Sequence, residues 1–349
     1  MKNKLIFEFS KNKTDGDSSL NNLLGGKGAN LAEMSNMKIP VPPGFTITTE
    51  VCNYFTENNK LPDNLDNEIR KAVKNLESLS DKSFGGEGTP LLLSVRSGGR
   101  VSMPGMMDSV LNIGLNDSNV FQLAEAFNDE RFALDSYRRL IQMYSNVVLG
   151  VEHERFEAVL ANKKRMDNVV SDADFNVDQL NWIINAYKNT VERFTDSLFP
   201  QDPYEQLTGA IEAVFNSWQN KRAVIYRKIN NIPDSWGTGA TIQSMVFGNL
   251  NDKSGTGVAF TRNPSNGDKE LYGEYLINAQ GEDVVAGIRT PHPIRKHSKI
   301  EQESLESKFP KAYKELLEIS TKLENHFKEA QDIEFTIENQ DIYLLQTRT

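Results

Sequence analysis

The stretch 332–348 of this 349-residue chain predicts a β-hairpin, and this hairpin restricts what the rest of the chain can form. Residues 332–337 and 342–348 each suit a strand, and the polar residues between them suit a turn. Side chains two apart on a strand point the same way, so Asp332 and Glu334 share one face. Two neighbouring carboxylates repel each other unless a cation lies between them, and Mg²⁺ binds one or two carboxylates together with substrate phosphates. The pattern therefore indicates either a metal site or an edge hairpin with a solvated polar face.

The second strand of the hairpin carries Gln346 and Arg348, which are also two residues apart. They face the carboxylates only if Glu334 lies opposite Gln346 and Asp332 lies opposite Arg348. This pairing requires a loop with an odd number of residues, for example 339–341. A two-residue turn would place Gln346 on the other face. We therefore expect an odd loop if these four side chains act together.

Composition restricts the class of protein. The chain is 38% hydrophobic and 25% charged, which is typical of soluble globular proteins, and it is long enough for about two domains. The net charge of −9 argues against nucleic acid or an anionic membrane as the main partner. The first residues lack the apolar core of a signal peptide, and no apolar run is long enough to span a membrane. The single Cys52 excludes an intramolecular disulfide, so we expect a cytoplasmic protein. The four histidines lack metal-ligand spacing.

Three segments suit the binding of phosphate groups. The glycine-rich segment 25–28 presents Lys27 on a loop just before a helix, where free N–H groups bind anions; the alternative is a glycine turn with a surface lysine. The apolar run 91–95 predicts a buried strand that ends in Arg96 and a flexible glycine pair, and an arginine held in this way suits either phosphate or a structural ion pair. The Ser-Gly-Thr-Gly segment 254–257 predicts a loop that directs N–H groups at an anion, or a plain hairpin loop.

Hydrophobic periodicity predicts the other elements. The segment 116–201 has helical spacing throughout and no nucleophile or metal-ligand set, so we expect a helical insert in which Arg138 and Arg139 are structural. The predicted helices are 50–58, 65–79, 120–127, 131–148, 153–163, 177–198, 204–230 and 301–330, and the further predicted strands are 5–9, 241–249 and 271–278.

Long motifs cover nearly the whole chain, at 23–34, 94–108, 255–264, 273–287, and 332–336 with 345–348. Together they resemble the N-terminal nucleotide-binding domain of the pyruvate, phosphate dikinase family. The related phosphoenolpyruvate synthases and rifampin phosphotransferases share the Ser-Val-Arg-Ser strand, but a different segment follows it, whereas Ser-Met-Pro-Gly-Met-Met-Asp at 102–108 is typical of the dikinases.

The resemblance implies an α+β architecture, the ATP-grasp fold, in which two lobes surround a nucleotide cleft. The first lobe would comprise 1–115 and 202–248, and the all-helical insert would be 116–201. The second lobe, with the metal-binding hairpin, would be 249–349. Since cleft closure excludes water from phosphoryl transfer, we expect the two lobes to hinge.

The resemblance also implies roles for individual residues. Lys27, Arg96 and Arg348 would be catalytic and bind phosphates, and Asp332 and Glu334 would hold Mg²⁺. The backbone of the hinge at 243–246 would recognise adenine. The nucleotide-binding residues implied in this way are Lys27, Arg96, Gly105, Gln243, Met245, Val246, Thr256, Gly257, Glu282, Gln346 and Arg348.

In the family, the domain transfers the β-phosphoryl of ATP, as a pyrophosphoryl group, to a histidine of a carrier domain. Inorganic phosphate then accepts the γ-phosphate, and the phosphohistidine phosphorylates pyruvate at a barrel domain. This sequence has no Thr-Ser-His-Ala carrier segment and no barrel sequence. We therefore expect both partners in the same longer chain or in a separate chain. The alternatives are a stand-alone or truncated nucleotide-binding module without transferase activity, and ATP-dependent phosphorylation of a small molecule, which segment 102–108 disfavours.

Overall fold

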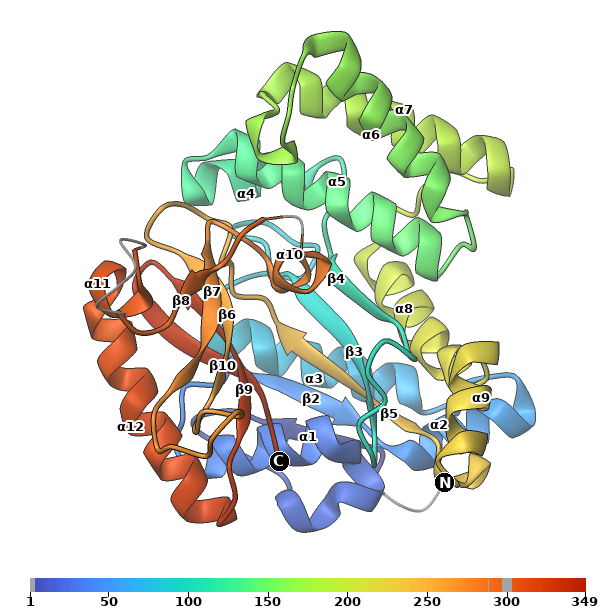
Figure 1. The fold of residues 1–349 in the computed structure, drawn as a ribbon. Helices are drawn as coiled ribbons and strands as arrows, with labels where there is room; N and C mark the ends of the chain where they lie inside the picture. Colours follow the sequence, from blue (N-terminus) through green and yellow to red (C-terminus); the bar gives the residue numbers. More distant parts are fainter. Residues whose placement is uncertain (1–3, 288, 297–302) are drawn as a thin grey trace. The chain divides into compact units, whose positions relative to one another are not determined.

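The computed structural model of the protein describes residues 4–287, 289–296 and 303–349 (Figure 1). The chain forms two compact units, each with helices and a sheet, so it is a mixed α/β protein. Unit 1 comprises Met1–Phe7, Asn22–Gly25 and Gly44–Met245, and unit 2 comprises Glu8–Asn21, Gly26–Pro43 and Val246–Thr349. The prediction of helices combined with strands is thereby confirmed.

The first sheet belongs mainly to unit 1 and has five strands in the order β1-β2-β5-β3-β4. Its central strand β5 pairs antiparallel with β2 on one side and β3 on the other. Helix α8 (Pro203–Ser217) contacts β3, β4 and β5, and helix α2 (Thr49–Asn58) contacts β5. The strands are β1 (Ile6–Phe9), β2 (Gly44–Ile47), β3 (Leu93–Gly99), β4 (Ser109–Ile113) and β5 (Thr238–Ser244).

The predicted helical insert consists of four helices, and its longest pair, α5 and α7, pack against each other. Local capping sets their starts: the Asp129 carboxylate accepts the Phe132 N–H before α5, and the Asn176 side chain accepts the Gln179 N–H before α7. The helices are α4 (Asn119–Phe127), α5 (Glu130–Val147), α6 (His153–Asp167) and α7 (Val177–Thr195), close to the predicted bounds.

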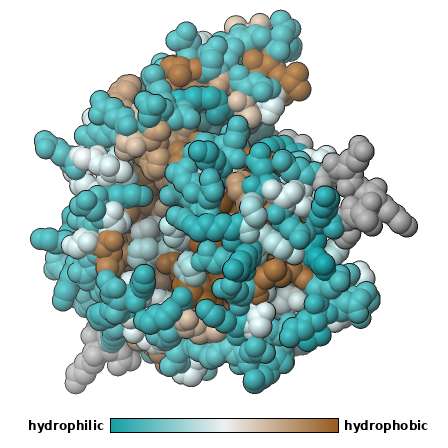
Figure 2. Space-filling view, turned by 90° about the vertical axis from the view of Figure 1, so that its left-hand side faces the viewer, coloured by the Kyte–Doolittle hydropathy of each residue, from teal (hydrophilic) through white to brown (hydrophobic). Residues whose placement is uncertain are grey.

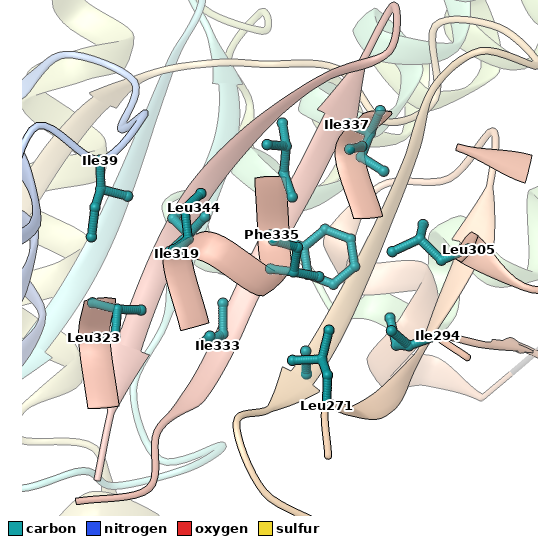
Figure 3. Packing of buried hydrophobic residues seen from close by; sticks show 14 of the residues in the cluster. Ile39, Leu271, Ile294, Leu305, Ile319, Leu323, Ile333, Phe335, Ile337 and Leu344 are labelled. Atoms are coloured by element: carbon teal, nitrogen blue, oxygen red, sulfur yellow. The ribbon is translucent and has the colours of Figure 1, made fainter. Parts of the chain in front are cut away.

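The second sheet lies in unit 2, with strands in the order β10-β9-β6-β7-β8. One face of it forms a hydrophobic core, in which Ile333, Phe335 and Ile337 of β9 lie among residues from several other elements (Figure 3). Buried side chains of α12, among them Ile319 and Leu323, pack into this core. The strands are β6 (Gly255–Phe260), β7 (Tyr272–Ile277), β8 (His292–Pro293), β9 (Asp332–Glu338) and β10 (Asp341–Arg348).

Two of the other predicted helices differ from the structure, whereas the helix predicted at 65–79 is confirmed. The single helix predicted at 204–230 is two helices, α8 and α9, separated by a turn after Trp218. The predicted helix 301–330 is interrupted at Pro310, which lacks an N–H and begins a new helix, and its predicted start at Glu301 lies outside the described residues. These helices are α1 (Asn21–Asn36), α3 (Leu65–Ser80), α9 (Lys221–Ile229), α10 (Gly281–Ala286), α11 (Leu305–Lys308) and α12 (Pro310–Phe327).

The two units differ from the predicted lobes near the N-terminus. The break after Met245 lies close to the predicted boundary at 248, but Glu8–Asn21 and Gly26–Pro43 belong to unit 2. The reason is hydrophobic: Phe9, Leu31 and Met34 are buried in the core of the second sheet. The helical insert is part of unit 1.

The surface seen in Figure 2 is mainly hydrophilic, with apolar residues scattered in small groups. Within the described ranges, no helix combines the length and the apolar character needed to cross a membrane.

Candidate functional site

The hairpin of β9 and β10 brings four predicted site residues together on one face of the second sheet. Glu334 lies opposite Gln346, and Asp332 lies opposite Arg348. The predicted register is therefore confirmed. The intervening residues Ile333 and Phe335 point to the other face, where they are fully buried. Because the core fixes that face, the polar face of the hairpin cannot rotate away without unpacking the core.

The predicted odd loop is wrong, and a β-bulge explains how the register is still reached. The turn has two residues, Asn339 and Gln340, both with positive φ (48° and 73°), as a tight hairpin turn requires. Leu344 lies opposite Phe335, but the next paired residue is Gln346, opposite Glu334. The extra residue Leu345 shifts the register by one and returns Gln346 to the face of the carboxylates.

Arg348 and Asp332 form a charge-assisted hydrogen bond across the hairpin. The Arg348 Nε lies 2.6 Å from the Asp332 Oδ2, and the arginine side chain keeps 39% of its surface exposed against 18% for the aspartate. Because part of the Arg348 guanidinium is exposed, it can also contact an anion from solvent. The positive charge of Arg348 balances part of the negative charge of Asp332. A cation that binds Asp332 would compete with this pair.

A third carboxylate, Glu274, lies on the same face and was missed by the sequence analysis. Val258 of the central strand β6 is opposite Glu334 on one side and opposite Glu274 on the other. The alternation of residues 272–277 could have placed Glu274 on this face, but only with the strand order known. Two strand spacings separate Glu274 from Glu334, roughly 10 Å, so the two cannot bind one ion directly.

The donor set of the hairpin fits Mg²⁺ as a partial site. Asp332 and Glu334 are two oxygen donors on a rigid strand, which matches the one or two carboxylates that Mg²⁺ takes beside substrate phosphates. Across residues 4–287, 289–296 and 303–349, no group of three or more His, Cys, Asp or Glu side chains is arranged to hold a metal ion by itself. A metal at this hairpin would therefore need oxygen atoms from its substrate.

Lys27 lies in helix α1, just after a break. The predicted glycine loop is wrong: the helix runs from Asn21 to Asn36 and is interrupted only at Gly25, whose φ is 69°. Lys27 therefore occupies the first turn after the break. A Cβ at Gly25 would come within 1.7 Å of the Gly98 carbonyl oxygen of β3, so only glycine fits this position.

Arg96 of β3 is oriented by a neighbouring amide. Its Nη2 donates to the Gln243 Oε1 at 2.6 Å, and Gln243 is almost completely buried on β5. The prediction that the strand ends at Arg96 is wrong, because β3 continues through Gly99, opposite Thr238. Gly98 and Gly99 are therefore part of β3 and pair with β5.

The expected hinge at 243–246 comprises the last two residues of β5 and the two residues that follow it. The Met245 N–H donates to the Leu92 carbonyl oxygen at 2.9 Å, and the Phe247 N–H donates to the Glu338 carboxylate at 2.6 Å. In this structure the Met245 N–H is therefore engaged within the protein. Glu338, at the end of β9, is a second residue that the sequence analysis missed.

The loop predicted at 254–257 is instead the start of the central strand β6. Thr256 is buried, and its hydroxyl donates to the Phe335 carbonyl oxygen at 3.1 Å. At Gly257 a Cβ would lie 2.5 Å from the Glu274 carbonyl oxygen. The glycines of this segment are needed for close packing of the strands, and the sequence analysis mistook this requirement for loop flexibility.

Two further predicted residues lie outside the strands. Gly105 is in a turn with φ 69° and has no atom within 4 Å of a virtual Cβ. The segment around it is anchored by Arg222, which donates from Nε to the Met106 carbonyl at 3.1 Å and from Nη2 to Asp108. Glu282 lies in the first turn of α10.

The predicted residues are divided between the two units. Arg96, Gly105, Gln243 and Met245 belong to unit 1, and the others belong to unit 2. Unit 1 also contains a cavity of about 760 Å³ lined by parts of α5, α8 and α9, including Glu212 and Asn216. None of the predicted site residues lines it.

Comparison with known proteins identifies the class. The family described as the pyruvate phosphate dikinase AMP/ATP-binding domain matches residues 21–85, 60–313 and 296–349. The chain therefore belongs to this family.

Individual relatives agree with the match. The chain is 52% identical over 347 residues to the pyruvate, phosphate dikinase of Rickettsia conorii, 50% over 351 residues to that of Rhizobium meliloti and 49% over 347 residues to that of Clostridium symbiosum. Each alignment covers 99% of this chain and 38% or 39% of the relative. The chain thus spans about two fifths of the length of these relatives.

Proposed function

We propose that the chain is an ATP-grasp phosphotransfer domain. It binds ATP with Mg²⁺ and transfers the β-phosphoryl, as a pyrophosphoryl group, to a histidine of a carrier domain, after which inorganic phosphate accepts the γ-phosphate. The observation that carries this proposal is the polar face of the hairpin, where Asp332, Glu334, Gln346 and Arg348 lie in matched register. Membership of the AMP/ATP-binding family supports it.

The charges suit a polyphosphate. Lys27 and Arg348 in unit 2 and Arg96 in unit 1 supply three cations, and phosphoryl transfer depends on positioning and on electrostatic stabilisation of the charge that moves between oxygens. Arginine at two of the three positions favours bidentate binding to phosphate oxygens. We assign phosphate binding and catalysis to these three residues.

The hairpin supplies the rest of the proposed phosphate site. Asp332 and Glu334 would hold Mg²⁺, which, when bound, neutralises charge on the phosphate oxygens. Arg348 pairs with Asp332 before ATP binds and turns its exposed guanidinium to phosphate afterwards, so the arginine exchanges one anion for another. Gln346 lies two residues before Arg348 on the same face of β10 and adds an amide N–H donor beside it.

Further residues complete the proposed nucleotide site. Gln243 orients the Arg96 guanidinium through their hydrogen bond. The backbone of Met245 and Val246 would recognise the adenine ring, in which case the carbonyl groups are the available partners at Met245, since its N–H is engaged. Residues assigned to contact the nucleotide or its phosphates on the strength of the family match are Gly105, Thr256, Gly257 and Glu282.

We further propose the roles of the larger parts. The first lobe is 1–115 with 202–248, adjusted by the transfer of Glu8–Asn21 and Gly26–Pro43 to the second lobe. Segment 116–201 is a helical insert. The carrier-histidine domain and a pyruvate-binding barrel domain are the proposed partners, and the proposed compartment is the cytoplasm.

The decisive test is transfer of label from [β-³²P]ATP to a separately produced carrier-histidine domain of a relative. We expect label on the carrier with the wild-type chain and Mg²⁺, and at least a hundredfold less with Arg96→Ala, Arg348→Ala or Glu334→Gln, since each removes charge stabilisation of the transition state. Arg70→Ala removes an exposed arginine paired with Asp66 and is the matched control.

The same experiment separates the second candidate, a nucleotide-binding module without transferase activity. The chain's coverage of only 39% of its relatives keeps this candidate open. ATP binding without label on any carrier supports it. Full transfer by the Glu334→Gln and Arg348→Ala variants contradicts the site assignment.

A further inference from the structure

The outer edge of strand β10 is covered by the N-terminal segment of unit 2. Among the strands of the described residues, β10 lies at the end of its sheet, beside β9. The Leu344 N–H donates to the Pro40 carbonyl oxygen at 2.8 Å, and the Asn30 Nδ2 donates to the Thr347 carbonyl oxygen at 2.8 Å. Both contacts join parts of unit 2. They replace the hydrogen bonds that a further strand would make.

The Asn30 contact lies between two proposed phosphate-binding groups. Thr347 is fully buried and is flanked along β10 by Gln346 and Arg348, whose side chains point to the polar face. Its hydroxyl donates to the buried Gln331 Oε1 at 2.9 Å. Thr347 is thus held at its side-chain hydroxyl by Gln331 and at its backbone carbonyl oxygen by Asn30.

Lys27 lies on the same side of α1 as Asn30. The two residues are three apart in the helical segment after Gly25, so their side chains are neighbours on one face. Leu31, four residues after Lys27, and Met34 are buried in the core of the second sheet, which identifies this face as the one toward the sheet. One helical turn therefore separates Lys27 from the hydrogen bond to β10.

From this arrangement we infer that Asn30 is a positioning residue, which holds the Lys27 helix and the Gln346–Arg348 end of β10 in one frame so that all three side chains act on the same polyphosphate. The inference rests on the proposed function. Asn30 does not touch the nucleotide; it acts through the Thr347 carbonyl. Without its hydrogen bond, α1 keeps its hydrophobic contacts, but the lysine and the arginine lose their fixed spacing.

The test compares Asn30→Ala and Asn30→Asp with matched variants of the same helix. Asn36 also donates from its side chain to a backbone oxygen, that of Gly16 at 3.0 Å, but on an exposed side, so Asn36→Ala and Asn36→Asp are the controls. Mg·ATP binding is measured by calorimetry for all five proteins. For both Asn30 variants we expect affinity to fall about three- to tenfold, as for the loss of one hydrogen bond. The controls should stay within about twofold of wild type, since exposed hydrogen bonds contribute less.

The pH dependence distinguishes positioning from general damage to the fold. An aspartate at position 30 can donate to the Thr347 carbonyl only when it is protonated, and an aspartic acid has an ordinary pKa of about 3.9. Relative to wild type at each pH, Asn30→Asp should regain affinity as the pH falls below about 5, whereas Asn30→Ala should not. Expressing each value relative to wild type removes the effects of the neighbouring charged groups Asp332, Glu334, Glu33 and His326, which all five proteins share.

Hydrogen exchange gives a readout that does not need ATP. Amides of 343–348 should exchange faster in Asn30→Ala than in Asn36→Ala. If wild type fails to bind ATP while this difference is present, the proposed function falls and the anchoring of β10 stands. Unchanged ATP affinity and unchanged exchange in both Asn30 variants would overturn the inference, as would equal losses in the Asn36 controls.

Discussion

The buried charge cluster of the helical insert offers a sharp test of what holds this part of the chain together. Asp135 is buried on α5, where its carboxylate accepts hydrogen bonds from the Arg138 Nε at 2.9 Å and the Arg139 Nε at 3.0 Å. Arg138 is only 2% exposed and donates from Nη1 to the Gln142 Oε1 at 3.0 Å. Replacing Asp135 by asparagine keeps the shape of the side chain but leaves the Arg138 charge without a counter-charge.

The expected cost is large because the arginine cannot reach water. Removing one member of a buried ion pair costs about 3–5 kcal/mol. The free energy of unfolding of a typical domain is about 5–15 kcal/mol, so Asp135→Asn should remove a substantial part of it. Asp66, which pairs with Arg70 on the exposed surface of α3, gives the matched control, and Asp66→Asn should cost about 0.2–1 kcal/mol.

The pH dependence of stability gives a second, independent readout. Burial by itself would raise the pKa of Asp135, but the charges of Arg138 and Arg139 outweigh it and hold the pKa well below its usual range. A carboxyl with a lower pKa in the folded than in the unfolded state stabilises fully above the unfolded value of about 3.9, and the stabilisation is lost as the pH falls below it. Wild type should therefore lose stability between about pH 5 and pH 3 more steeply than Asp135→Asn.

Urea denaturation followed by far-ultraviolet circular dichroism, at several pH values, measures both effects. A cost below about 1 kcal/mol for Asp135→Asn would refute the reasoning, because it would mean that Arg138 is effectively solvated. Parallel pH curves for wild type and variant would refute the assignment of the shifted pKa.

Three further predictions follow from the described contacts. Gly25→Ala should lower the melting temperature strongly, since its Cβ would meet the Gly98 carbonyl at 1.7 Å, whereas Gly267→Ala, with φ 79° but open space, should cost only about 1–2 kcal/mol of backbone strain; equal shifts would contradict this. Burial raises the pKa of Cys52 to about 11, so the native protein at pH 8 should resist a thiol-specific disulfide reagent until urea is added, and prompt reaction would contradict the burial. Gln243→Leu should weaken ATP binding about three- to tenfold by calorimetry, because it removes the hydrogen bond that orients Arg96, and an unchanged affinity would argue against that role.

Sequence patterns were sufficient where one physical requirement decides the structure. The helices of the insert follow from apolar spacing and end-capping residues, and α4 to α7 lie close to their predicted bounds. The polar face of β9 was also predictable, because the alternation that buries Ile333 and Phe335 leaves Asp332 and Glu334 on the opposite face. In the helices of the insert and in strand β9, the spacing of apolar residues and the burial of their side chains predict the same structure.

Patterns failed where two requirements give the same local signal. Glycines at 255 and 257 suggest a loop, but here they let strands β7 and β9 approach β6. The bulge at Leu345 was not recognised, because Leu345 continues the apolar run of Leu344 as an ordinary strand residue would. The hydrogen bond from Asn30 to Thr347 joins residues 317 positions apart, so its existence depends on the tertiary structure.

That separation has a consequence for how the protein is made. The apolar face of α1, with Leu31 and Met34, emerges from the ribosome long before β9 and β10, which complete its hydrophobic core. At about 5–20 residues per second, the separation of 317 positions from Asn30 to Thr347 takes on the order of 15 to 60 seconds to synthesise. Transiently exposed apolar surface makes a chain prone to aggregation, and α1 carries such a surface until β9 and β10 have been made.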